Sequence, residues 1–310
     1  MGKKKVVVAL GRNFFGKNIP EQKLAVKDAA IAIADLVEAK YTVIVTHSNG
    51  PQIGMIHAAL NEFAMEHSDY TPAPMSVCSA MSQGYIGYDL QNEIRTELLN
   101  RGIYKSVATI LTQVQVDPFD PAFQTPAKTI GRYMSREEAE REMKKGNHVT
   151  GSEETGYQRI VSSPTPVQIY EIDAIRALAE TDAVVIACGG GGIPVLEQGT
   201  RLKGASAVIE KDTIAAKLAE DVDADCLLFL SANDKMYIHE GMADERVLGE
   251  MTIADAKREI EAENLEKIST LPKLKAAVTF ASSGEGRYSV ITNAQCALRG
   301  MEGQAGTIIR

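Results

Sequence analysis

The sequence predicts an α/β protein built around a largely parallel β-sheet. Short β-branched runs alternate with helical patterns along most of the chain, which is the order of elements that covers a parallel sheet on both faces. The composition agrees, because 310 residues with 45% hydrophobic and 24% charged content make a globular chain long enough for one large α/β domain or two average ones. The predicted strands are Lys5–Leu10, Tyr41–Thr46, Val107–Thr112, Ala183–Cys188, Cys226–Leu230 and Tyr288–Thr292.

Two of the intervening helices carry clear signals. Leu90, Ile94 and Leu98 recur every four residues, which indicates a helix with one buried face. Thr252 followed by Asp255 has the spacing of a capping box and marks the start of another helix. The sequence does not give the order of the strands in the sheet.

One long segment departs from this alternation. Asp117–Pro166 contains five prolines, a capped and highly charged helix over Ser135–Lys145, and the polar, glycine-containing stretch Gly146–Gln158. This is too long and too polar for a simple connection within a compact sheet. We therefore expect a single domain over residues 1–310, with a protruding subdomain inserted at about 117–166.

Charge and cysteine content narrow the functional classes. The 33 Lys and Arg against 41 Asp and Glu give a net charge of −8, which disfavours nucleic acid and anionic lipid as partners. An anionic ligand must then be held by a local cluster of cations or backbone amides. Cys78, Cys188, Cys226 and Cys296 form no CxxC pair, and no apolar run approaches the roughly 18 residues of a membrane span. These features favour reduced thiols in a cytoplasmic protein with no structural metal site.

The first glycine-rich turn follows the first predicted strand. Gly11–Asn18 fits the GxxxxGK pattern of a phosphate-binding loop, except that Asn18 stands where Ser or Thr would hold magnesium. The favoured alternative is a plain turn from strand to helix. A P-loop nucleotide enzyme remains a minor hypothesis.

Two further glycine-rich turns, Thr46–Gly54 and Cys188–Pro194, also follow predicted strands. Glycines at the carboxyl end of a parallel strand let backbone N–H groups approach an anion. Because each glycine costs chain entropy on folding, the run Gly189–Gly192 favours ligand contact over packing alone. It is not a dinucleotide fingerprint, since Pro194 replaces the last glycine.

Several isolated polar residues have simple structural interpretations when each is considered alone. Lys128 taken alone is a surface lysine, Lys211 next to Asp212 is a solvated helix start, and His47 is a hydrogen-bonded loop histidine more readily than a titrating one. Glycine turns combined with scattered lysines suit phosphoryl transfer, in which catalysis is mostly positioning and charge neutralisation.

Taken together and in order, nine segments resemble carbamate kinase, a branch of the amino-acid kinase family. The resemblance runs nearly end to end and implies an α/β/α sandwich around one mainly parallel sheet, with a protruding subdomain and a homodimeric assembly. The segments are Val7–Asn13, Thr46–Gly54, Met81–Tyr88, Thr112–Phe123, Pro126–Gly131, Val161–Pro166, Cys188–Val195, Ala207–Asp212 and Leu271–Lys273.

The resemblance also implies an activity: reversible phosphoryl transfer between ATP and carbamate with Mg²⁺, running mainly from carbamoyl phosphate and ADP to ATP in arginine metabolism. Lys128 and Lys211 would stabilise the phosphoryl group in flight, and Asp212 would orient them. The nucleotide would be served by Gly190, Gly191, Gly192 and Lys273. The substrate-binding residues would be Gly11, Arg12, Asn13, Ser48, Asn49 and Gly50.

The sequence departs from the family pattern mainly at the turns expected to face ligands. Arg12 and Ser48 replace glycines, and Ile268 begins a segment that differs from the family's Gly-Ser-Met. The expected lobe motif is reduced to Glu154–Gly156, and Ser231–Lys235 occupies the segment expected to hold adenine. Three hypotheses remain. The first is a phosphotransferase acting on carbamate or a related small carbamoyl or carboxylate compound, and the second is a weakened member that binds nucleotide or carbamoyl phosphate as a sensor or interaction partner. The third, a P-loop or other nucleotide enzyme, is the least favoured.

Overall fold

An eight-stranded sheet forms the centre of the computed structural model, which describes residues 3–262, 265–266 and 269–310. Neighbouring strands run parallel except for one antiparallel pair, β16 and β17. The predicted α/β class with a mainly parallel sheet is therefore confirmed. In sheet order the strands are β15 (Glu250–Met251), β17 (Thr307–Ile309), β16 (Tyr288–Thr292), β12 (Cys226–Leu230), β1 (Lys5–Leu10), β2 (Thr42–His47), β9 (Val184–Ile186) and β3 (Val107–Thr109).

The predicted strands match the observed ones in the centre of the sheet, but near one edge the predicted strands are longer than the observed ones. β1, β12 and β16 have the predicted bounds, and β2 is displaced by one residue. β9 ends at Ile186, because Cys188 adopts a left-handed conformation with φ 54° that cannot continue a strand. β3 ends at Thr109, and the chain then leaves the sheet to enter a second one.

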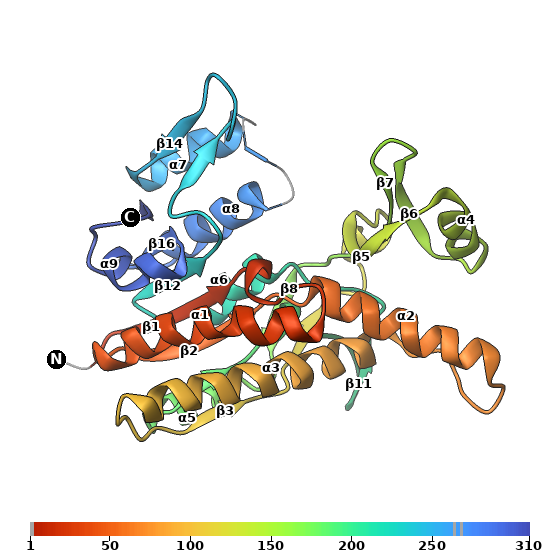
Figure 1. Cartoon of the computed structure of the whole chain (residues 1–310), viewed down its shortest axis with the longest axis horizontal. Helices are drawn as coiled ribbons and strands as arrows, with labels where there is room; N and C mark the ends of the chain where they lie inside the picture. The colour runs from red at the N-terminus through yellow and green to blue at the C-terminus, as the bar shows by residue number, and fades with distance from the viewer. Residues whose placement is uncertain (1–2, 263–264, 267–268) are drawn as a thin grey trace.

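Helices cover both faces of the sheet (Figure 1). Alternate residues of β1 enter different cores: Val6 and Val8 pack with α1, α3 and α9, whereas Val7 packs with α5, α6 and α8. Leu90, Ile94 and Leu98 lie fully buried in the first of these cores, as their spacing predicts. These helices are α1 (Ile19–Glu38), α3 (Met75–Asn100), α9 (Ala297–Met301), α5 (Ile172–Glu180), α6 (Lys211–Asp221) and α8 (Thr270–Ala281).

Smaller elements extend this core. A four-stranded sheet has the order β11-β10-β4-β8, a hairpin pairs β13 with β14, and α7 packs on α8. The predicted capping box at Thr252 is present at the start of α7. No described helix is long and apolar enough to cross a membrane. The bounds are β4 (Gln113–Val116), β8 (Pro166–Ile169), β10 (Ile193–Gln198), β11 (Arg201–Gly204), β13 (Met236–Ile238), β14 (Arg246–Leu248), α7 (Ile253–Glu261) and α2 (Gly50–Glu66).

Residues 128–161, within the segment expected to protrude, fold into a three-stranded antiparallel sheet with one helix that stands away from the body (Figure 1). We call this unit the lobe. Ser135 and Glu138 form the capping box of its helix. Ile130 and Val161 at its base share a small hydrophobic cluster with Ile53 of α2. The elements of the lobe are β5 (Lys128–Met134), α4 (Arg136–Lys144), β6 (His148–Ser152) and β7 (Gly156–Val161).

Candidate active site

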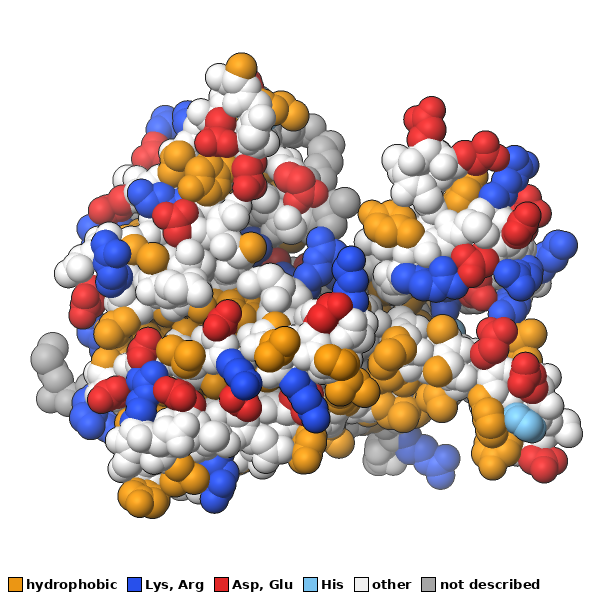
Figure 2. All heavy atoms as spheres, viewed as in Figure 1, with side chains coloured by type: hydrophobic (Ala, Val, Ile, Leu, Met, Phe, Trp, Pro, Cys, Tyr) orange, Lys and Arg blue, Asp and Glu red, His pale blue; other side chains and the backbone are white. Residues whose placement is uncertain are grey.

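A cavity of about 700 Å³ opens where the carboxyl ends of neighbouring parallel strands meet. Segments following β1, β2, β9 and β12 line it, as do Lys128 from the lobe and residues at the start of α6 and α8. Figure 2 shows the molecule hollowed between the lobe and the part carrying α7, with lysine and arginine side chains at the floor of the hollow. Open α/β sheets bind their ligands at this edge.

Three helices begin at the cavity: α2 at Gly50, α6 at Lys211 and α8 at Thr270. The preceding residues of α2 and α6, Asn49 and Glu210, make no side-chain cap hydrogen bond. The start of α2 has no acidic residue in its first turn to offset its partial positive charge, whereas α6 has Asp212 there. Such helix ends favour an anion in the cavity.

The two lysines expected to act on a phosphoryl group reach the cavity from different elements. Lys211 pairs with its neighbour Asp212, with 2.6 Å between Nζ and Oδ1. Lys128 forms an ion pair with Glu210. Glu210 was not among the residues predicted for the site, although it stands directly before Lys211 in the sequence.

Further cations line the same cavity. Lys273 donates a hydrogen bond to the carbonyl of Ser269 at 3.2 Å. Desolvation, assisted by the nearby charge of Lys211, lowers the pKa of Lys273, while Asp212 and Glu210 oppose that change. Ile268, one of the noted departures, lies outside the described residues. In the described ranges, Arg12 and Lys235 also line the cavity without an acidic partner.

The turn after β2 is fixed by buried hydrogen bonds. The Ser48 amide donates to the Leu10 carbonyl at 3.1 Å, which ties the turn to the end of β1. Asn49 donates from Nδ2 to Ser82 Oγ at 2.8 Å. Burial lowers the pKa of His47 to about 4, and its ring contacts the Ser48 carbonyl at 3.0 Å. His47 is therefore neutral and hydrogen-bonded at neutral pH, as the sequence favoured, but it is the last residue of β2 rather than a loop residue.

Close packing accounts for the four consecutive glycines, contrary to the sequence argument that packing alone would not. A Cβ on Gly189 would lie 2.1 Å from Nε2 of His47, and one on Gly190 would lie 2.0 Å from Nδ2 of Asn49. Gly190, Gly191 and Gly192 have φ values of 65°, 100° and 83°, which side chains rarely tolerate.

The same glycines differ in their access to the cavity. Gly190 lines the cavity beside Asn49, whereas Gly191 and Gly192 pack against Ile209 and Val114 and do not line it. A nucleotide role for Gly191 and Gly192 stays a prediction.

The first glycine turn behaves as a turn from strand to helix. A Cβ on Gly11 would lie 2.9 Å from the Leu230 carbonyl, so glycine is required there. Arg12 begins a short 3₁₀ turn with its side chain exposed and without a positive φ, so its backbone needs no glycine. Asn18 caps α1 by accepting from the Glu21 amide at 3.0 Å. Only the first part of the turn, 11–13, lines the cavity.

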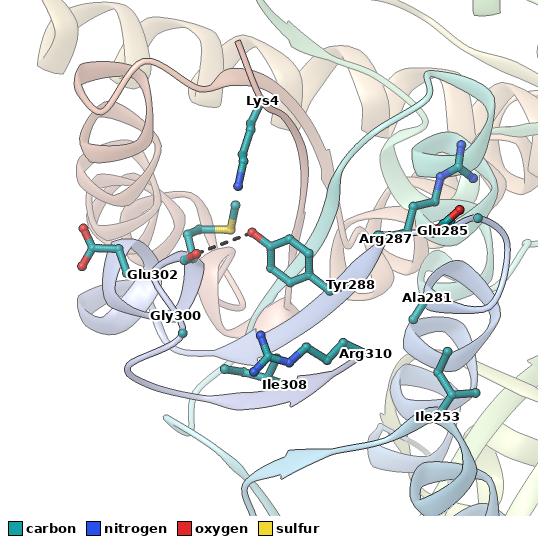
Figure 3. A pocket seen from close by; sticks show the side chains of 14 residues that line it. Lys4, Ile253, Ala281, Glu285, Arg287, Tyr288, Gly300, Glu302, Ile308 and Arg310 are labelled. Carbon is teal, nitrogen blue, oxygen red and sulfur yellow. Dashed lines mark hydrogen bonds between the residues drawn. The ribbon is translucent and has the colours of Figure 1, made fainter. Parts of the chain in front are cut away.

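A second cavity, of about 650 Å³, lies at the amino ends of β1 and β16, and its lining contains none of the predicted site residues (Figure 3). Its arginines are already neutralised, since Arg310 pairs with Glu250 and Arg287 pairs with Asp223. The Tyr288 hydroxyl donates to a backbone carbonyl at 3.5 Å, and burial raises its pKa. The strand-end cavity is therefore the candidate active site.

Comparisons with known proteins point in the same direction. The model of the Amino acid kinase family matches residues 4–293. The chain is 49% identical over 306 residues to the carbamate kinase-like protein YqeA of Escherichia coli strain K12, covering 99% of both chains. It is 44% identical over 309 residues to carbamate kinase of Clostridium perfringens, covering 96% and 98% of the two chains. The structure of carbamate kinase from Giardia lamblia bound to AMP-PNP matches with a TM-score of 0.90 at 31% identity, covering 99% of this chain and 98% of that one.

Proposed function

The chain belongs to the amino acid kinase family and is a carbamate kinase-like phosphotransferase, and on that premise we propose that it transfers a phosphoryl group reversibly between ATP and carbamate. A related small carbamoyl or carboxylate compound is an equally suitable acceptor, because Arg12 and Ser48 alter the acceptor turns. The observation that carries the proposal is the convergence of Lys128 and Lys211 on one cavity at the strand ends. Two anionic substrates can meet only where fixed positive groups offset their repulsion.

In this proposal the cavity has an acceptor end and a nucleotide end. The acceptor end is formed by the turns after β1 and β2, with Arg12, Asn13, Ser48, Asn49 and Gly50. Gly190 lies beside Asn49, so any nucleotide contact it makes is with the terminal phosphate, the group that is transferred.

The nucleotide end is formed by the segment after β12 and the start of α8, with Lys235 and Lys273. Magnesium suits this end as an ion carried by the phosphates, its usual ligands in kinases. The carboxylates of Glu210 and Asp212 are already engaged by lysines. In the described part of the chain, histidine, cysteine, aspartate and glutamate side chains form no group of three that could hold a metal ion.

In the proposed reaction an oxygen of the ADP β-phosphate attacks the phosphorus of carbamoyl phosphate, and the bond to the carbamate oxygen breaks. Lys128 and Lys211 donate hydrogen bonds to the phosphoryl oxygens as charge shifts between donor and acceptor. Asp212 keeps Lys211 oriented, and no side chain needs to accept a proton.

The test is ATP formation from carbamoyl phosphate and ADP by the purified protein, with AMP-PNP and carbamoyl phosphate binding measured by calorimetry. Turnover that is lost in Lys211→Ala supports the proposal. Binding of both ligands without turnover would instead support the sensor hypothesis, for which the altered turn at Arg12 is the structural argument. Absence of both binding and turnover would contradict the assignment of the cavity.

We also propose that the protein is a homodimer. Val77, Met81 and Tyr88 recur at helical spacing on α3 and are exposed. Figure 2 shows hydrophobic side chains gathered over α2 and the adjoining part of α3. An exposed apolar stripe of this kind is typical of a face covered by a partner. Analytical ultracentrifugation of wild type and Met81→Lys tests this, because a dimer closed by this face should dissociate in the variant.

We propose in addition that the protein is cytoplasmic. All four cysteines are free thiols, as is usual in a reducing compartment.

A further inference from the structure

Glu210 joins the lobe to the body of the protein. Its carboxylate pairs with Nζ of Lys128, the first residue of β5. For the part of the chain that the structure describes, this is the only ion pair between residues 128–161 and the remainder. The two residues are 82 positions apart in sequence, so only the tertiary fold brings them together.

The direction of the Glu210 carboxylate is informative. Glu210 occupies the N-cap position of α6, where Ser, Thr, Asp and Asn side chains commonly accept from backbone amides of the first turn. It makes no such hydrogen bond, and its backbone carbonyl alone accepts from the Ile214 amide at 3.1 Å. The carboxylate is directed to Lys128 instead.

The other contacts between the lobe and the body, which include a hydrogen bond from Arg159 to His57 of α2 at 2.8 Å, do not involve the Lys128 side chain. The Val208 amide donates to the Ser162 carbonyl at 3.0 Å. Gly54 of α2 lies so close to the lobe that a Cβ on Gly54 would be 2.4 Å from the Cα of Gly131. A lysine ammonium lies at the end of a flexible four-carbon stem, so a fixed backbone does not fix its position.

Each of the two lysines thus has its own carboxylate, from residues on either side of Lys211. Asp212 holds Lys211 and is buried, with 3% of its side chain exposed, whereas Glu210 holds Lys128 and is 27% exposed. The two pairs allow two ammonium groups to face one cavity without an unbalanced repulsion between them.

We infer that Glu210 is a positioning residue, which orients Lys128 of the lobe toward the phosphoryl group beside Lys211. This inference rests on the proposed function for its consequence in turnover, and on the ion pair alone for its effect on Lys128. Glu210→Gln should therefore free the Lys128 amine and lower turnover through Lys128, while Glu210→Asp, which keeps the charge, should restore part of the turnover.

The first arm of the test does not depend on activity. Lysine side chains of the ligand-free protein are acylated with acetic anhydride, and the rate at Lys128 is followed by mass spectrometry. Glu210→Gln should raise that rate at least threefold, because the variant frees the amine from its ion-pair partner. Glu220→Gln is the matched control, since Glu220 is an exposed residue of the same helix.

The second arm is a double-mutant cycle on turnover. Glu210→Gln should lower kcat about tenfold in the wild-type background and leave it unchanged within about twofold in the Lys128→Ala background. An unchanged acylation rate at Lys128 would overturn the inference, as would an equal loss of kcat in both backgrounds. Faster acylation in a protein that shows no turnover would overturn both the proposed function and the role of Glu210 in it, while leaving the orienting ion pair established. Circular dichroism and the acylation rate of Glu210→Asp guard against a folding defect.

Discussion

Asp212 is almost completely buried, with 2% of the residue exposed, yet its carboxylate lies 2.6 Å from the ammonium of Lys211, which reaches the candidate active site. The neighbouring lysine thus compensates a charge that would otherwise be costly to bury. This pair links the stability of α6 to the chemistry of the cavity.

Lys211→Ala should reduce both turnover and stability. Turnover should fall by roughly 100-fold or more, the scale seen when one positioned transition-state donor is removed. The free energy of unfolding should fall by roughly 1–3 kcal/mol, because Asp212 would remain buried without its partner. Urea unfolding and initial rates check the two effects. Lys217→Ala is the matched control on the same helix, where Lys217 pairs with Asp221 at 3.2 Å. Equal stability losses in both variants would contradict the compensating role of Lys211.

Lys128→Ala should also lower turnover by roughly 100-fold, but with little loss of stability. Its partner Glu210 is partly exposed and can be solvated once the lysine is removed. Steady-state kinetics and thermal unfolding of the same preparation separate the two quantities. Wild-type turnover in this variant would return Lys128 to the role of a surface lysine.

Arg12→Gly should raise turnover with carbamoyl phosphate and ADP above a weak wild-type level, with a further gain in combination with Ser48→Gly. The exposed arginine adds a charged fork of donors at the acceptor end, which suits a substrate with an additional anionic group better than carbamate. Because Arg12 has no positive φ, the gain should come from space and charge rather than from relief of backbone strain. Initial rates at saturating ADP give the measurement. Robust wild-type turnover that Arg12→Gly leaves unchanged would show that the arginine is peripheral.

Nucleotide affinity should fall as the pH is raised. The fall should begin at a lower pH than the titration of an ordinary lysine would cause. The pKa of Lys273 is lowered chiefly by desolvation, so this side chain loses its positive charge at a lower pH than a solvated lysine. AMP-PNP dissociation constants between about pH 7 and 10 check this. Lys273→Met should weaken binding about tenfold at pH 7 and flatten the pH profile, whereas Lys275→Met, at an exposed site on the same helix, should do neither. A profile that keeps its slope in Lys273→Met would assign the titration to another group.

Ligand binding should slow hydrogen exchange in the lobe, most of all in β5, which carries Lys128. The outer strand β6 is largely exposed, whereas Ile130 and Val161 anchor the base, so closure should act on the side of the lobe facing the cavity. Exchange is compared between the free protein and the complex with AMP-PNP and carbamoyl phosphate. Equal protection of β5 in both states would contradict gating by the lobe.

The sequence by itself determined the class of the fold and its central strands. The runs that became β1, β12 and β16 are mostly β-branched or apolar and almost completely buried because both faces of each strand are covered, and a local composition of that kind is visible without any partner. The helix starts at Ser135 and Thr252 were predictable for a similar reason, since a capping box closes within four residues. The nine segments that resemble carbamate kinase, occurring in the same order along the chain, then identified the family.

Only the tertiary structure decided what surrounds each functional residue. The strands β4, β8 and β11 escaped prediction because each has only four residues, and the pairing of β4 with β8 and β10 depends on contacts distant in sequence. Gly189 and Gly190 fit against His47 and Asn49, which lie more than 130 positions earlier, so no local pattern could reveal that packing requires them. Glu210 became significant only when the fold placed it against Lys128. A sequence pattern records the periodicity of single elements, whereas a site is made by side chains that meet across elements, and that meeting is fixed by the packing of the whole chain.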